Sequence, residues 1–116
     1  MAARDPQQIF DHHAQALGGE DLEGIISDYA DDALVICQGT VYPGTDGVRQ
    51  VFTQLLRDVP QASWELPTTV YADDVLYLEW RARSAKAKVD DGIDTFVFRD
   101  GRIQLQTVRY TLQATG

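Results

Sequence analysis

The 116-residue chain is poor in cysteine, in long hydrophobic runs and in positive charge. Its one cysteine, Cys37, cannot form an intrachain disulfide, so a disulfide-rich scaffold is excluded. The longest uninterrupted aliphatic stretch, residues 33–37, is far too short to span a bilayer. The 10 lysines and arginines are outnumbered by 18 aspartates and glutamates, which gives a net charge of −8. Because nucleic acids and anionic membrane surfaces bind clustered positive charge, we expect neither as a partner.

Cofactor motifs are missing as well. The sequence has no GxGxxG or P-loop, and no HExxH, CxxC or GxSxG pattern. His12 and His13 are adjacent, so they lie on different faces of a helix and do not form a metal pair. We therefore expect no cofactor and no metal. The opening six residues lack the apolar core of a signal peptide, and the expected location is cytoplasmic.

What the chain does contain is typical of a globular domain. Hydrophobic residues make up 44% and charged residues 24%. A chain of this length can bury a core of its own. There is no linker, repeat or low-complexity segment, and we expect one domain over residues 1–116.

Two helices are predicted near the N-terminus. Asp5-Pro6 is a helix start, with an acidic N-cap before a proline at the first helical position. Apolar residues then recur at helical spacing until Gly18-Gly19. Asp21 caps a second helix whose apolar face includes Tyr29, and Asp31-Asp32 ends the pattern.

The rest of the chain predicts one helix and five strands. Residues 33–38 are apolar and β-branched, and a turn is expected at Gly39 and residues 42–44. Thr45 is the expected N-cap of a third helix that ends before Pro60. Four long strands are then predicted over residues 61–72, 75–83, 86–99 and 102–112. Asp73-Asp74 and Asp100-Gly101 are the expected turns, and a bulge is expected at residues 90–92. This pattern is typical of an α+β fold in which helices cover one face of a curved sheet.

The alternation of side chains along each strand predicts what points inward. Asp94 shares a face with Phe96 and Phe98, so its carboxyl group is expected to face the core or a cavity. The strand 75–83 is ambiguous. Its apolar set could be core, or it could form an apolar outer face with Glu79 and Arg81 in the cavity beside Asp94; the second interpretation is favoured, because it gives both faces a use.

Four segments carry a resemblance to a known family. They are residues 20–23, residues 29–33, the pair of residues 42–44 with 47–49, and residues 94–103. In these segments the chain resembles the SnoaL-like and ketosteroid-isomerase-like branch of the nuclear transport factor two superfamily. The resemblance implies a cone in which a curved, mostly antiparallel sheet wraps around the N-terminal helices, with an apolar pocket at the open end. It also implies a homodimer through the outer sheet face, which would suit Leu76, Leu78 and Trp80.

The resemblance implies functional positions too. Steroid isomerases of this branch have a carboxylate base at the end of the first strand, where this chain has Cys37. They have a tyrosine oxyanion donor on the first helix, where this chain has His13, and a protonated acid at the position of Asp94. Polyketide cyclases tend to have a carboxylate late in the last strand, where residues 108–111 contain no acid.

Asp94 is the principal candidate for catalysis, because burial among aromatic side chains raises the pKa of a carboxyl group. His13 and Glu79 are the other catalytic candidates, as a ligand-facing imidazole and as a second carboxylate in the same cavity. For each there is a structural alternative: a buried Asp94 held by backbone donors or by Arg81, a core His13, and a Glu79 paired with Arg81 or Arg83 on a solvated face. Candidate ligand-binding residues are Tyr29, Cys37, Phe52, Phe96, Gln106 and Tyr110, with Cys37 also explained as a small buried hydrophobe.

We therefore expect a cofactor-independent enzyme of the isomerase, cyclase or dehydratase type, transferring a proton on a small apolar molecule. The alternative is a non-catalytic small-molecule-binding or dimerisation domain with the same fold.

Overall fold

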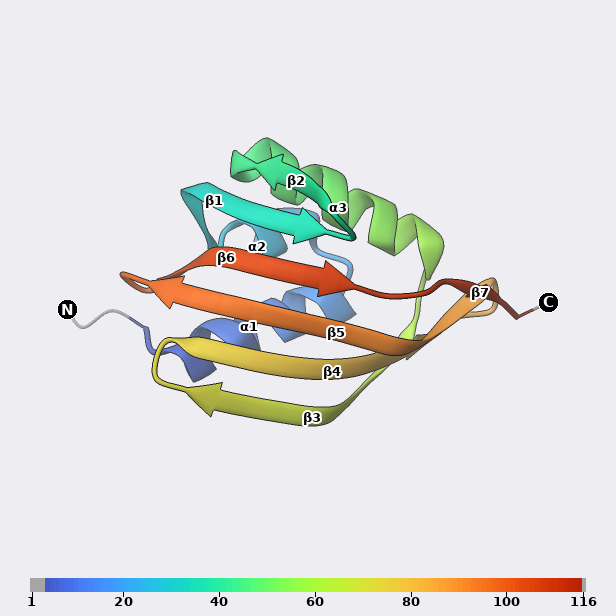
Figure 1. Ribbon diagram of the computed structural model, residues 1–116. Coiled ribbons are helices and arrows are strands. Elements are labelled where there is room, and N and C mark those ends of the chain that lie inside the picture. Colours follow the sequence, from blue (N-terminus) through green and yellow to red (C-terminus); the bar gives the residue numbers. More distant parts are fainter. Residues whose placement is uncertain (1–3, 116) are drawn as a thin grey trace.

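The computed structural model describes residues 4–115, in which three helices lie on one side of a single curved sheet (Figure 1). The helices are α1 (Pro6–Gly18), α2 (Leu22–Ile26) and α3 (Gly44–Asp58). The strands are β1 (Tyr29–Cys37), β2 (Thr40–Pro43), β3 (Ser63–Ala72), β4 (Val75–Arg83), β5 (Ala87–Arg99), β6 (Arg102–Arg109) and β7 (Gln113–Ala114). This is the predicted α+β class, with an unclosed mixed sheet. None of the described helices is long and apolar enough to cross a membrane.

Helix α1 begins and ends as its sequence predicts. The Asp5 carboxylate accepts a hydrogen bond from the Gln8 N–H at 2.8 Å, and the Gln8 side chain accepts one from the Asp5 N–H at 2.9 Å. This reciprocal pair satisfies two backbone donors that a helix start leaves free. Helix α2, in contrast, ends at Ile26, and the prediction that it includes Tyr29 was wrong. The Asp28 carbonyl accepts a bond from Ile103 N–H at 2.8 Å, and this draws the chain into the sheet.

The segment before α3 also differs from its prediction. Residues 40–43 form strand β2 instead of part of a turn, because Gln38 and Gly39 both have positive φ (52° and 89°) and reverse the chain directly after β1. Helix α3 then begins at Gly44 after Pro43, with no side-chain cap. The prediction that Thr45 is the N-cap was therefore wrong.

The sheet has the order β2-β1-β6-β5-β4-β3, with β7 paired to β5. Every pair is antiparallel except β1 with β6. The turns predicted at Asp73-Asp74 and Asp100-Gly101 are present. The predicted bulge is present as well: Trp80 is opposite Gly92 and Ala82 is opposite Val89, which leaves one extra residue on β5.

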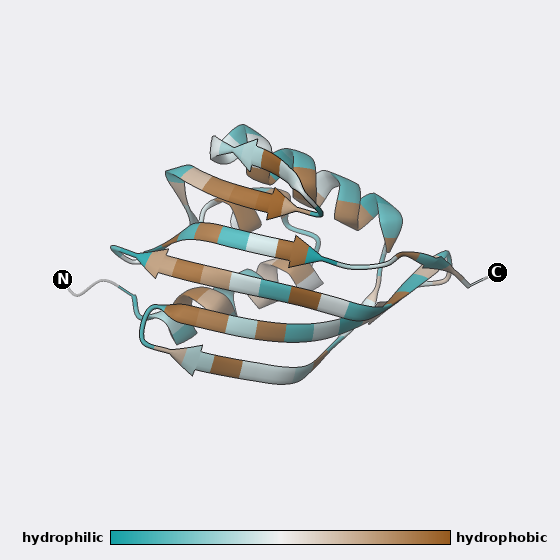
Figure 2. Cartoon of the chain, in the orientation of Figure 1, coloured by the Kyte–Doolittle hydropathy of each residue, from teal (hydrophilic) through white to brown (hydrophobic). Residues whose placement is uncertain are grey.

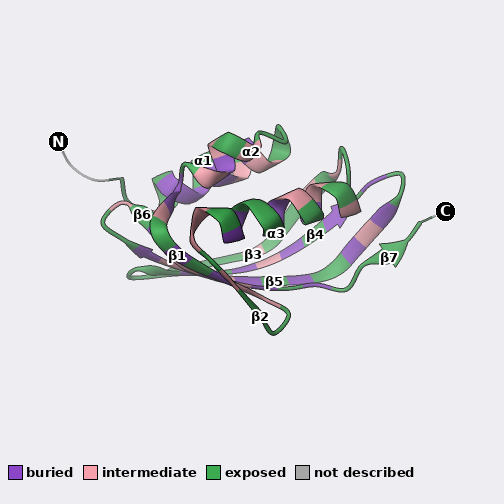
Figure 3. Ribbon diagram, turned by 90° about the horizontal axis from the view of Figure 1, so that it is seen from above, coloured by how far each residue is buried: buried purple, intermediate pink, exposed green. Residues whose placement is uncertain are grey.

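The helices cover one face of the sheet, and buried residues alternate with exposed ones along the strands (Figure 3). On β4, Leu76, Leu78 and Trp80 are all buried under the helices. The favoured interpretation that they form the outer face was wrong, and the alternative that they are core is confirmed. The reason is the register: Leu76 is opposite Phe96 and Leu78 is opposite Asp94, and directly opposed residues share a face.

A buried ionic cluster ties the N-terminal segment to the start of the sheet. Asp28 is fully buried, and its carboxylate accepts hydrogen bonds from Arg4 Nη1 at 2.8 Å and from His12 Nδ1 at 2.7 Å. Both partner side chains are partly exposed. Since a lone buried carboxylate is unfavourable, this pairing fixes α1 against β1 and so helps to position the residues of α1 that face the sheet.

Candidate functional site

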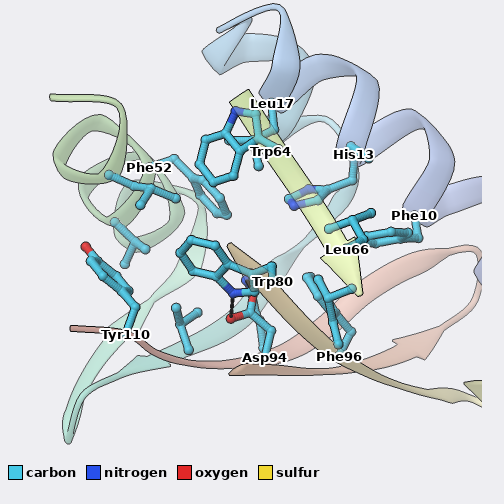
Figure 4. Close-up of a pocket in the computed structure, with 16 residues that line it drawn as sticks. Phe10, His13, Leu17, Phe52, Trp64, Leu66, Trp80, Asp94, Phe96 and Tyr110 are labelled. Carbon is cyan, nitrogen blue, oxygen red and sulfur yellow. Dashed lines mark hydrogen bonds between the residues drawn. The ribbon is translucent and has the colours of Figure 1, made fainter. Parts of the chain in front are cut away.

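A small cavity lies between the inner face of the sheet and helices α1 and α3 (Figure 4). Its volume is about 120 Å³. Aromatic side chains make up much of its wall: Phe10, Phe52, Trp64, Trp80, Phe96 and Tyr110. The polar side chains in the lining are His13, Asp94 and Gln106, besides the hydroxyl of Tyr110 and the indole nitrogens. A mostly apolar cavity with a few convergent polar groups is the usual form of a small-molecule site.

Asp94 on β5 provides the carboxylate of this cavity. The side chain is almost completely buried, and both of its oxygens accept hydrogen bonds. Trp80 Nε1–H donates to Oδ1 at 2.9 Å, and Gln106 Nε2–H donates to Oδ2 at 2.9 Å. Burial raises the pKa of Asp94 to about 7, although the two donors act in the opposite direction. The group can therefore hold or release a proton near neutral pH.

Gly92 determines how Trp80 reaches Asp94. Trp80 and Gly92 are directly opposite each other across β4 and β5. A Cβ atom at position 92 would lie 2.2 Å from Cε2 of the indole, so only glycine lets the ring lie flat against β5. The bulge beside it adds to the local twist. The dashed contact in Figure 4 is the indole bond to Asp94 that results.

The second donor, Gln106, is held in turn by Tyr29. The Tyr29 hydroxyl donates a hydrogen bond to Gln106 Oε1, which leaves the amide nitrogen to face Asp94. Both side chains are fully buried, and burial raises the pKa of Tyr29 well above its usual value, so the phenol keeps its proton. A chain of hydrogen bonds thus runs from β1 through β6 to β5.

His13 on α1 is a second titratable group in the lining that is almost fully buried. Its ring is 5.4 Å from that of Phe52 and 5.5 Å from that of Phe96, centroid to centroid, in edge-on geometry. Burial lowers the pKa of His13 to about 4, so the imidazole is neutral at neutral pH. Within residues 4–115, its buried Nδ1 has no hydrogen-bond partner. A buried polar atom without a partner is unfavourable and is rare in folded proteins.

The structure brings together most, but not all, of the residues singled out from the sequence. Phe52, Phe96, Gln106 and Tyr110 line the cavity with Asp94 and His13, and Tyr29 contacts it through Gln106. Cys37 lies outside the cavity, in a neighbouring pocket, and burial raises the pKa of its thiol, which disfavours a nucleophilic role.

The prediction that Glu79 enters the cavity beside Asp94 was wrong. Glu79 lies on the outer face of β4, where the Tyr77 hydroxyl donates to it at 2.9 Å, and it does not share a cavity with Asp94. The contact of Trp80 with Asp94 was not expected from the sequence, because the apolar residues of β4 were placed on the outer face. Phe96 and Phe98 share a face of β5 with Asp94, and this was the signal that the apolar face of β4 lies beside them, once the two strands are known to pair.

Comparison with known proteins identifies the family. The family model described as a SnoaL-like domain matches residues 10–106. The chain belongs to this family. The predicted resemblance is thereby confirmed. No curated protein sequence matches this SnoaL-like chain.

Solved structures agree on the fold. SalBIII, an epoxide hydrolase/cyclase-like enzyme with a role in pyran ring formation in the polyether salinomycin, has a TM-score of 0.78 at 14% identity, covering 94% of this chain and 95% of its own. IdmH, a proposed polyketide cyclase from Streptomyces antibioticus, has a TM-score of 0.76 at 16% identity, with 92% of each chain covered. A SnoaL-like protein of unknown function from Burkholderia thailandensis is 22% identical, with a TM-score of 0.73 and coverages of 90% and 93%. At these identities the similarity establishes the fold alone.

The contact between Gly92 and Trp80 gives a first test. We expect Gly92→Ala to push the indole away and remove its hydrogen bond to Asp94. Because that bond lowers the pKa of Asp94, the pKa should rise above about 7, as it should in Trp80→Phe. An NMR titration of the Asp94 carboxyl carbon measures it. Gly18→Ala is the control, since no atom lies within 4 Å of a Cβ there; an unchanged pKa in Gly92→Ala would contradict this account of Trp80.

The two buried titratable groups give a second test. Asp94, with its pKa raised from 3.8 to about 7, is protonated in the folded protein and ionised in the unfolded chain between these values, so its contribution to stability falls as pH rises. His13, with its pKa lowered from 6.5 to about 4, makes a contribution that rises with pH over nearly the same window.

We therefore compare the slope of the unfolding free energy against pH with that of the unmodified protein. We expect Asp94→Asn to make this slope more positive and His13→Phe to make it more negative. Each change in slope is up to about 1 kcal/mol per pH unit. Urea unfolding between pH 4.5 and 6.5 measures both slopes. Changes of the same sign in the two variants would show that the burial of one of these groups is wrongly assigned.

Proposed function

We propose that this SnoaL-like domain is a cofactor-independent enzyme that transfers a proton on a small apolar molecule, with Asp94 as the proton-transferring group. The observation that carries the proposal is a single carboxyl group, with a pKa near 7, facing a mostly aromatic cavity. Groups tuned to the working pH transfer protons best in either direction. The proposal is also supported by the cyclase-like and hydrolase-like enzymes that share the fold.

The cavity limits what can react. An engineered apolar cavity of about 150 Å³ holds one benzene molecule, and this cavity is about 120 Å³. The part of the substrate beside Asp94 is therefore about one small ring in size. A polycyclic substrate would have to extend beyond the cavity.

His13 completes the proposed chemistry. The ionised Asp94 would take a proton from a carbon next to a carbonyl group, or from a hydroxyl group, and the protonated Asp94 would return it. The neutral His13 ring would hydrogen-bond the substrate oxygen on which charge develops, since its N–H donor would be aimed into a site with little water. Bound in this way, the substrate oxygen would supply the partner that the imidazole lacks within the described residues.

Proton exchange tests the function before the natural substrate is known. We expect the protein in D₂O to speed the deuteration of cyclohexanone beside its carbonyl group, as followed by NMR. We expect Asp94→Asn to slow the enzymatic rate about 100-fold, a usual loss for a missing general base. The amide is close in size to the carboxyl group, and rotation of Gln106 lets it meet the substituted side chain with a hydrogen bond.

Glu79→Gln is the matched control, because it neutralises a carboxylate on the opposite face of the sheet. Its rate should equal that of the unmodified protein. Full activity in Asp94→Asn would exclude Asp94 as the base. Cyclohexanone binding without any exchange would favour a non-catalytic small-molecule-binding domain.

We also propose that the outer face of the sheet pairs with a second copy of the chain, through residues other than those first expected. Val75, Val97, Leu105 and Leu34 are successive partners across four strands, and they form an apolar row. Tyr77 adds to it on β4 and is 36% exposed. Contiguous apolar surface of this kind is typical of an interface. Figure 2 views the sheet from this side.

A charge placed in the row tests the dimer. We expect the unmodified protein to sediment as a dimer and the double variant Val97→Lys, Tyr77→Lys as a folded monomer, because two lysines in each copy would be buried without partners. Leu112→Lys is the control, since Leu112 is exposed beyond the end of β6. A monomeric unmodified protein, measured by analytical ultracentrifugation, would rule out this interface.

A further inference from the structure

A second pocket adjoins the cavity and has a different chemical character. Its volume is about 320 Å³. Its lining comes from the end of β1, from β2 and from α3, and most of it is polar: Gln38, Thr40, Tyr42, Gln50, Gln54 and Asp58. Tyr110 and Val51 belong to the linings of both spaces. These two side chains therefore form the wall between an apolar cavity and a polar pocket.

Asp58 gives this pocket a negative charge at an unusual place. It is the last residue of α3, where the carbonyl ends of the helix already carry partial negative charge and where a cation is the favourable residue. Gln54 Nε2–H donates to one carboxylate oxygen at 2.8 Å, and the Tyr110 hydroxyl donates to the other at 3.2 Å. Among the described residues no lysine or arginine lines the pocket. The carboxylate thus has neutral partners only, and a cationic group would be a better one.

Tyr110 is the aromatic part of this wall. It follows the last residue of β6, so its own backbone is outside the strand ladder. Its ring packs 5.6 Å from that of Trp80, and its hydroxyl points away from Asp94 (Figure 4). The bond from this hydroxyl to Asp58 is long for an O–H donor. The pKa of Tyr110 is raised by burial and by Asp58, so the phenol stays a neutral donor that a cation could replace.

From this arrangement we infer that the polar pocket is a second subsite for the ligand. The ligand is apolar only in the one-ring part that lies beside Asp94, and its far end is a protonated amine. The inference rests on the proposed function, because the apolar end occupies the cavity beside Asp94. The amine end passes Tyr110 and binds the Asp58 carboxylate. A carboxylate or phosphate at that end is disfavoured, since it would meet Asp58 and the negative end of α3 without a cation to offset them.

Matched probes test the subsite by calorimetry at pH 7. Ethylbenzene tests the cavity alone, and 4-phenylbutylamine, 4-phenylbutan-1-ol and 4-phenylbutanoate add a cationic, a neutral and an anionic end. We expect the amine to bind roughly tenfold more tightly than the alcohol, and the carboxylate most weakly of the three. Benzylamine, whose charge is too near its ring to pass Tyr110, should gain no such advantage over toluene.

Two variants separate the subsite from the overall negative charge of the protein. Asp58→Asn should abolish the advantage of the amine and leave ethylbenzene binding unchanged. Asp46→Asn removes the same charge from the exposed start of α3, and the advantage should persist. Equal affinity of the amine and the alcohol, or an amine advantage that survives Asp58→Asn, overturns the inference while ethylbenzene binding still supports the cavity. If ethylbenzene itself fails to bind, the result contradicts the proposed function, because the cavity beside Asp94 then does not accept a ring.

Discussion

The desolvation of the Asp94 carboxyl group is the constraint to which the inner side of this sheet is adapted. A carboxyl group inside an aromatic cavity is tolerated only when hydrogen-bond donors meet it. Here the donors are Trp80 and Gln106, from the strands on either side. Each depends on a further residue, since Gly92 makes room for the indole and Tyr29 orients the amide. One buried oxygen pair therefore accounts for the choice of residue at positions on four strands.

Asp94 and His13 show how one cavity can hold two titratable groups in complementary states. Burial disfavours the charged form of each, which raises the pKa of the acid and lowers that of the imidazole. Near neutral pH the carboxyl group can exchange its proton while the imidazole stays neutral. A carboxyl group that can exchange its proton and a neutral imidazole thus lie together in the lining of one cavity. Between about pH 4 and 6.5 the two shifts contribute to the pH dependence of the folding free energy with opposite signs.

The wider fold says less about chemistry than these local contacts do. The solved structures described above share it at 14–22% identity, and they include cyclase-like enzymes as well as a protein of unknown function. A curved sheet over helices supplies a cavity, and the side chains that line it decide its use. In this chain an apolar cavity about one ring in size adjoins the polar pocket that lies behind Tyr110 and contains Asp58.

Several features were within reach of the sequence because they depend on neighbours a few residues apart. The limits of α1 follow from Asp5-Pro6 and from the glycines at its end, and the turns follow from Asp73-Asp74 and Asp100-Gly101. The inward direction of Asp94 follows from its two-residue spacing from Phe96, which puts both side chains on the same face of the strand. The family followed from short segments of the same kind.

The composition of the site was decided by the tertiary structure. Whether Trp80 or Glu79 faces Asp94 depends on the register of β4 against β5. The residues of the loop that joins these two strands do not predict that register. Tyr29 was predicted in a helix but begins a strand, because the Asp28 carbonyl accepts a hydrogen bond from the N–H of Ile103, far along the chain. The wall that Tyr110 forms between two pockets requires β6 and α3 to meet. By itself the sequence determined the elements and the inward carboxyl group; the packing of segments distant in sequence decided which side chains surround it, because contact between them exists only after the sheet has formed.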